Sequence, residues 1–89
     1  MNVIIPTSMR QHTGGVGIAQ VEGKTIDEAI LFLLDSHPEL KPHLLDASGH
    51  LVSYVNVFVN DTNIRDLNDG NTTLNDTDEI VLVPALAGG

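Results

Sequence analysis

Apolar residues that alternate with polar ones mark the strands that the sequence predicts. Residues 54–60 alternate strictly, with Val55, Val57 and Val59 on one face, which is typical of a strand that is buried on one side. Other segments rich in β-branched or alternating apolar residues lie at 2–8, 16–21, 63–65 and 80–83. We expect the first two to form a hairpin and residues 63–65 to be a short edge strand.

One long helix is predicted between these strands. Thr25 and Glu28 have the spacing of a capping box, which satisfies free backbone N–H groups at a helix start. The apolar residues that follow recur at the spacing of one helical face: Ile26, Ala29, Ile30, Leu33 and Leu34. Leu31 and Phe32 widen this stripe, so we expect the helix to be covered on more than one side. His37-Pro38 ends the pattern.

The order of these elements predicts an α+β fold. A mixed sheet of four to five strands, covered on one face by one main helix, is the economical way to bury the apolar stripes. If the first and last strands pair in parallel, the last strand is central and the arrangement is a β-grasp. We expect one domain at residues 1–84. Residues 85–89 (Ala-Leu-Ala-Gly-Gly) are expected to be a flexible tail, because glycine loses more conformational freedom on ordering than other residues.

Composition narrows the classes of function. The 89 residues include no cysteine, which excludes thiol catalysis and cysteine metal sites. The net charge of −8 provides no basic footprint for nucleic acid, and an acidic surface suits a basic protein partner. No apolar segment approaches the roughly 20 residues that a membrane helix needs, and no signal peptide is recognised. We therefore expect a cytoplasmic protein that binds neither nucleic acid nor membrane.

Several separated motifs in one order resemble those of a known family. They are Ile5-Pro6-Thr7, Arg10-x-His12-Thr13-Gly14-Gly15, Val55-Asn56-Val57-x-Val59-Asn60-Asp61, Asp76-x-Asp78-Glu79-Ile80 and Pro84-Ala85-x-Ala87-Gly88-Gly89. Together they resemble the ubiquitin-like sulfur carriers of the ThiS/MoaD superfamily, which serve the thiamine and molybdopterin pathways. Within it, they are most similar to the branch that supplies sulfur for cysteine synthesis in actinobacteria. The resemblance covers essentially the whole chain and implies the β-grasp fold.

The resemblance implies that Gly89 is the residue that reacts. An E1-like enzyme would use ATP to form an acyl-adenylate at the Gly89 carboxylate, and a sulfur donor would displace AMP to leave a thiocarboxylate. Leu86, Ala87 and Gly88 would lead this terminus into the enzyme. In the cysteine branch, the sulfur would be accepted by a pyridoxal-phosphate-dependent cysteine synthase, and a metal-dependent peptidase would release cysteine. The chain itself would be a carrier and not an enzyme, and ATP and the other cofactors would be bound by its partners.

Strand alternation also predicts an apolar surface beside the tail. If Ile80 and Leu82 point into the core, Val81 and Val83 point away from it. Phe58 faces outward in the same way. With Leu86, these residues would form an exposed patch of the kind that binds partner proteins.

Two readings are open for the Arg10–His12 segment. Arg10 and His12 could contact a partner, or His12 could cap the turn whose backbone angles Gly14 and Gly15 supply.

The sequence shows no further metal-binding or catalytic motif. His37, His43 and His50 lack the spacing of a metal site, and no nucleophile–base pair marks a catalytic centre. Two alternatives remain for the reactive terminus. The chain could be a ubiquitin-like modifier that is conjugated through Gly89, or the permanent small subunit of a molybdopterin-type synthase.

Overall fold

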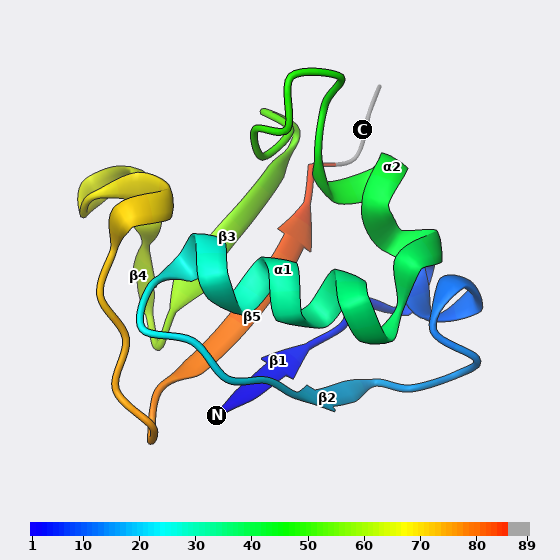
Figure 1. Cartoon of the computed structure of the whole chain (residues 1–89), viewed down its shortest axis with the longest axis horizontal. Coiled ribbons are helices and arrows are strands. Elements are labelled where there is room, and N and C mark those ends of the chain that lie inside the picture. The colour runs from blue at the N-terminus through cyan, green and yellow to red at the C-terminus, as the bar shows by residue number, and fades with distance from the viewer. Residues whose placement is uncertain (86–89) are drawn as a thin grey trace.

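A five-stranded sheet forms one layer of the molecule, and helix α1 (Ile26–Ser36) lies across one of its faces (Figure 1). The computed structural model describes residues 1–85. The strands are β1 (Asn2–Ile4), β2 (Ile18–Gln20), β3 (Val55–Val59), β4 (Thr62–Asn63) and β5 (Glu79–Pro84). Their order in the sheet is β2-β1-β5-β3-β4. The predicted α+β class and β-grasp arrangement are therefore confirmed.

Strand β5 is the centre of the sheet. It pairs in parallel with β1, where Val3 lies opposite Ile80, and antiparallel with β3, where Val57 lies opposite Leu82. The β1–β2 hairpin is antiparallel, as expected. Because β1 and β5 run in the same direction, the loop after β1 and the chain after β5 leave the sheet at the same end.

The core lies between the sheet and α1. Burial alternates along β3 as the sequence pattern predicts, with Val55, Val57 and Val59 buried. Ile80 and Leu82 of β5 are likewise buried, and they meet the apolar stripe of α1. All five residues predicted for that stripe are buried: Ile26, Ala29, Ile30, Leu33 and Leu34. Burial of this kind contributes about 25 cal/mol per Å² of apolar surface, so these contacts hold the helix to the sheet.

Helix α1 begins at the predicted cap. The Thr25 hydroxyl accepts a hydrogen bond from the Glu28 N–H at 3.3 Å. In return, the Glu28 carboxylate accepts one from the Lys24 N–H at 3.1 Å, one residue earlier than in a standard capping box. The expectation that α1 is covered on several sides was wrong: Leu31 is 61% exposed and Phe32 is 39% exposed. The sheet covers one face of this helix, and that face is already filled by the stripe.

Within residues 1–85, four short 3-10 helices and one further α-helix connect the main elements. They are η1 (Thr7–His12), η2 (Pro38–Leu40), α2 (Lys41–Leu44), η3 (Ile64–Asp66) and η4 (Asp69–Asn71). Helix α1 ends at Ser36, directly before His37-Pro38 as predicted, and η2 and α2 follow. No helix within residues 1–85 is both long and apolar enough to cross a membrane.

The first strand is shorter than the predicted 2–8. Strand β1 ends at Ile4, although the Ile5 N–H still donates to the Gly17 carbonyl at 2.8 Å. Pro6 has no N–H to continue the ladder. Its carbonyl instead accepts from the Met9 N–H at 2.9 Å, which begins η1 and buries Met9 in the core.

The short edge strand predicted at 63–65 is present, but it begins one residue earlier and ends two residues earlier. Strand β4 covers Thr62–Asn63, and the chain then turns into η3. The Asn63 side chain causes this change, because its carbonyl oxygen accepts a hydrogen bond from the Arg65 N–H at 2.9 Å. Ile64 in this turn lies in the core with 4% exposure.

Candidate functional site: the end of the central strand

Strand β5 brings Ala85, the last described residue, to one end of the sheet. Pro84 pairs with Val55, and the Ala85 N–H donates to the Tyr54 carbonyl at 2.6 Å, which extends the ladder one residue beyond β5. The predicted tail residues Leu86, Ala87, Gly88 and Gly89 lie outside the described residues. Four residues span at most about 14 Å. The Gly89 carboxylate is therefore confined to that distance from an anchored point at Ala85.

The η1 loop and α2 meet at the same end of the sheet. The rings of His12 in η1 and His43 in α2 are stacked, with centroids 4.0 Å apart and planes inclined by 22°. This contact joins η1 and α2, which are far apart in the sequence but lie at the same end of the sheet (Figure 1). Sequence reasoning noticed both histidines without any signal that would pair them.

The interpretation of His12 as the cap of the turn was wrong. Thr13 fills that role, because its buried hydroxyl lies within hydrogen-bonding distance of the carbonyls of Arg10 (3.1 Å) and Val16 (2.8 Å). Gly14 and Gly15 adopt φ values of +67° and +90°, so they supply the turn angles as predicted.

Arg10 has a structural contact of its own. Its Nε donates to the Ile5 carbonyl at 3.1 Å. Its guanidinium lies 3.0 Å from the position that a Cβ on Gly17 would occupy. Arg10 therefore holds η1 against the end of β1. That Arg10 or His12 contacts a partner stays a prediction.

The outer face of the sheet carries the predicted apolar residues. Val83 is 41% exposed, and Phe58 and Val81 are half-buried, with Phe58 directly opposite Val81. The strand register adds two residues that sequence reasoning missed, because Ile4 lies opposite both Val81 and Ile18. We call this set the sheet-face patch: Ile4, Ile18, Phe58, Val81 and Val83. Leu86, the remaining predicted member, lies outside the described residues.

Nothing local in the sequence separates Ile4 from the core residues beside it. Val3, Ile4 and Ile5 form a continuous apolar run, so alternation gives no direction for Ile4. Ile18 is 58% exposed and becomes part of the patch only through the β1–β2 pairing. Their inclusion extends the apolar face across four strands.

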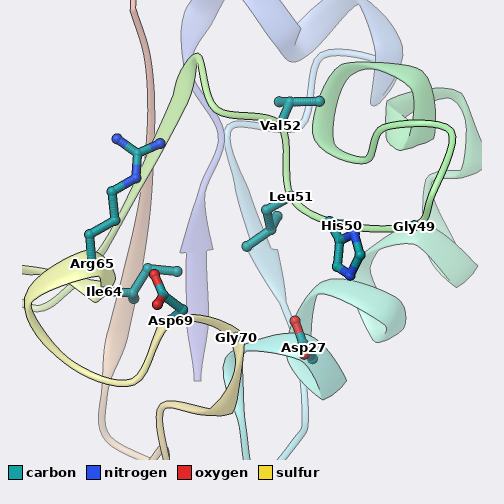
Figure 2. Close-up of a pocket in the computed structure, with 9 residues that line it drawn as sticks. All are labelled: Asp27, Gly49, His50, Leu51, Val52, Ile64, Arg65, Asp69 and Gly70. Carbon is teal, nitrogen blue, oxygen red and sulfur yellow. The ribbon is translucent and has the colours of Figure 1, made fainter.

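A separate cavity of about 250 Å³ lies between the start of α1, residues 49–52 and the η3–η4 segment (Figure 2). Its lining contains Asp27, Asp69, His50 and Arg65 but no serine, threonine, cysteine or lysine. Figure 2 shows that the Arg65 side chain extends away from Asp69. Its guanidinium donates to the Asn56 side chain at 2.8 Å and the Ser53 carbonyl at 2.6 Å. This cavity therefore offers no hydroxyl, thiol or amine nucleophile, and its guanidinium is held by other parts of the chain.

Metal binding finds no support in the part of the chain that the structure describes. Within residues 1–85, no three His, Asp or Glu side chains gather where they could hold a metal ion. The candidate site is thus the end of β5, with η1, α2 and the sheet-face patch beside it.

Comparison with known proteins agrees with this fold. The model of the ThiS family matches residues 3–89. The chain belongs to the ThiS family. This ThiS-family chain is 35% identical to the sulfur carrier protein CysO of Mycobacterium tuberculosis over 91 residues, which cover 100% of the chain and 98% of CysO. The relationship predicted from the separated motifs is confirmed.

Solved structures give the same relationship. CysO of Amycolatopsis orientalis, in its complex with BexX, aligns with a TM-score of 0.91 at 34% identity, over 99% of this chain and 98% of that one. The small archaeal modifier protein 1 (SAMP1) of Methanosarcina acetivorans aligns with a TM-score of 0.89 at 28% identity, over 99% and 94% of the two chains. This ThiS-family chain is thus similar both to sulfur carriers and to a protein modifier.

Proposed function

We propose that this chain is a sulfur carrier whose terminal Gly89 is converted to a thiocarboxylate and delivers sulfur for cysteine synthesis. The observation that carries this proposal is the family match, which runs to residue 89 and therefore includes the Gly-Gly terminus. Likeness over the full chain to the CysO sulfur carriers supports the choice of pathway.

A carboxylate is a poor electrophile, so the Gly89 carboxylate must first be activated. An oxygen of the Gly89 carboxylate attacks the α-phosphorus of ATP on an E1-like enzyme, and pyrophosphate leaves. Hydrosulfide released by the sulfur donor then attacks the acyl carbon and displaces AMP, and loss of its proton leaves the thiocarboxylate. This chain supplies the reacting terminus, and Gly88 and Gly89 carry no Cβ that would obstruct a narrow active-site channel.

The body of the molecule gives this terminus a fixed origin. Central strand β5 is hydrogen-bonded on both sides, and the Ala85–Tyr54 bond holds the chain where it leaves the sheet. The sheet-face patch beside this point would dock the E1-like enzyme and, later, a pyridoxal-phosphate-dependent cysteine synthase. A metal-dependent peptidase would then release cysteine in the cytoplasm. CysO of A. orientalis forms a complex with BexX, which supports a docking role for this fold.

Deletion of Gly89, or Gly88→Val, should abolish thiocarboxylate formation. The first change removes the residue that is activated, and the second places a β-branched side chain in the channel. Each protein is incubated with the adenylating enzyme of the same organism, ATP and a sulfur donor, and its intact mass is measured. Wild-type protein and a Leu31→Ala control should gain the mass of one oxygen-to-sulfur replacement. A Gly89-deleted chain that still gains sulfur would overturn the proposal.

Protein modification is a second candidate function, because SAMP1 aligns over nearly the whole chain. The same activated Gly89 would then form isopeptide bonds with lysines of other proteins. Denaturing gels of cells that express a tagged chain separate the two functions. A ladder of adducts that Gly89 deletion removes supports modification, whereas a thiocarboxylate without adducts supports sulfur transfer.

A further inference from the structure

A shallow groove of about 570 Å³ lies beside the point where the chain leaves β5. Its lining is mainly apolar: Pro42, Leu45, Ala47, Val52 and Tyr54, together with Lys41 and Asp46. Helix α2 and the hairpin at residues 45–52 form one side, and Tyr54 forms the other. We call it the α2 groove. It lies on the helix side of the sheet, whereas the sheet-face patch lies on the opposite face.

The walls of the α2 groove are held by backbone hydrogen bonds. Leu45 and Leu51 form a β-bridge, and the Val52 N–H donates to the Leu44 carbonyl at 2.9 Å. The turn between them is closed by the Asp46 carboxylate, which accepts from the N–H groups of Ser48 and His50 at 2.9 and 3.0 Å. A groove that is already formed costs little conformational entropy when it is filled.

The groove is exposed although its surface is apolar. Tyr54 is 53% exposed, and Ala47 and Pro42 are also exposed. These side chains therefore contribute little buried apolar surface to the core. Tyrosine in particular is enriched among the residues that contribute most to protein–protein binding, because its ring buries a large area at a small entropic cost.

The position of the groove indicates what covers it. The Tyr54 carbonyl accepts the Ala85 N–H, so the tail starts at the edge of the groove. The four residues beyond Ala85 extend at most about 14 Å. An enzyme that draws Gly89 into its active site therefore comes within about 14 Å of Ala85, which lies at the edge of the groove.

We propose that the α2 groove receives an apolar side chain of the adenylating enzyme. This contact rests on the proposed function and adds to it a second docking surface, so that the enzyme holds the carrier on both sides of the tail. The lining carries one charge of each sign, Lys41 and Asp46, so apolar contact and not charge is the basis of recognition in this groove.

Substitutions at Ala47 test the groove without disturbing the core, because this side chain is exposed. Ala47→Glu and Ala47→Lys both fill the groove but carry opposite charges, and Tyr54→Ser removes its wall. Initial rates of ATP–pyrophosphate exchange are measured with the adenylating enzyme of the same organism. All three should raise the KM for the carrier at least about tenfold and leave kcat within about twofold. The Ala47 variants block the groove and Tyr54→Ser removes an apolar contact, whereas none of them changes Gly89.

Leu31→Glu and Leu31→Lys are the matched controls, since Leu31 is exposed on α1 and does not line the groove. They should keep the KM of the wild type. Far-UV circular dichroism and thermal melting confirm the fold of every variant.

The outcomes separate the two proposals. A wild-type chain that the enzyme does not adenylate overturns the proposed function and with it the docking contact. Normal adenylation of the wild type with an unchanged KM for both Ala47 variants overturns the groove alone. An effect of only one charge sign also overturns it, because electrostatics and not filling would then be responsible. So does a wild-type dimer in sedimentation that Ala47→Glu dissociates, because a second copy would then occupy the groove.

Discussion

Val57 and Phe58 are neighbours in β3 with opposite surroundings. Val57 is 2% exposed between the sheet and α1, whereas Phe58 lies half-buried on the outer face beside Val81. A large aromatic side chain in that position contributes little to the core. Its apolar surface is instead available to a partner, together with Val83 and Ile18.

Phe58→Asp should weaken binding to the adenylating enzyme at least about tenfold without unfolding the chain. The substitution places a charge in the middle of the sheet-face patch, where an interface would have to desolvate it. Isothermal titration calorimetry gives the Kd. Leu31→Asp introduces the same charge on the exposed face of α1 and should leave the Kd unchanged. Loss of the folded state in Phe58→Asp would show instead that this residue belongs to the core.

At the scale of the element, α1 shows how a local signal and a tertiary contact act together. Thr25 caps the helix through its hydroxyl, and the Ile26 N–H donates to the Thr72 carbonyl at 3.0 Å. The first turn is thus satisfied by a side chain and by a distant loop. Thr72 is itself buried, and its hydroxyl accepts from the Asn68 N–H at 3.1 Å.

Thr25→Ala should lower the free energy of unfolding by about 1 kcal/mol, because it leaves the Glu28 N–H without its side-chain acceptor. Urea denaturation followed by circular dichroism measures the change. Ser36→Ala is the control, since Ser36 is exposed in the last turn of α1 and alanine favours helix. It should lie within about 0.5 kcal/mol of the wild type. Equal effects of the two substitutions would contradict the role of the cap.

At the scale of the whole molecule, the parallel pairing of β1 and β5 determines which segments lie beside the start of the tail. It brings η1, with His12, to the end of the sheet where the tail starts, and the His12–His43 stack joins α2 to the same end. The sheet-face patch and the α2 groove therefore flank one origin. The chain as a whole carries a net charge of −8, which favours encounter with a basic enzyme.

The association rate with the adenylating enzyme should fall as salt is added. Attraction between a chain of charge −8 and a basic surface is screened beyond about 10 Å at 0.1 M ionic strength. Stopped-flow fluorescence between about 0.02 and 0.5 M NaCl measures the rate, and the dissociation rate should change much less. A rate that is independent of salt would show that the charge serves solubility alone.

The sequence by itself determined the features that depend on neighbours in the chain. The Thr25 cap, the stripe of α1 and the alternation of β3 follow from periods of 3.6 and 2 residues, which side-chain burial imposes on a helix or strand. The separated motifs likewise indicated the family, and the reaction at Gly89 stays a prediction. The order of the elements then indicated the β-grasp arrangement once parallel pairing of the ends was assumed.

Only the tertiary structure decided features that depend on residues far apart in the chain. Ile4 and Ile18 joined the sheet-face patch through strand register, and Leu31 and Phe32 remained exposed because the sheet meets one face of α1. The His12–His43 stack and the α2 groove required three separate segments to meet at one end of the sheet. The physical reason is that a hydrophobic pattern states that a side chain prefers burial, but packing determines which surface covers it.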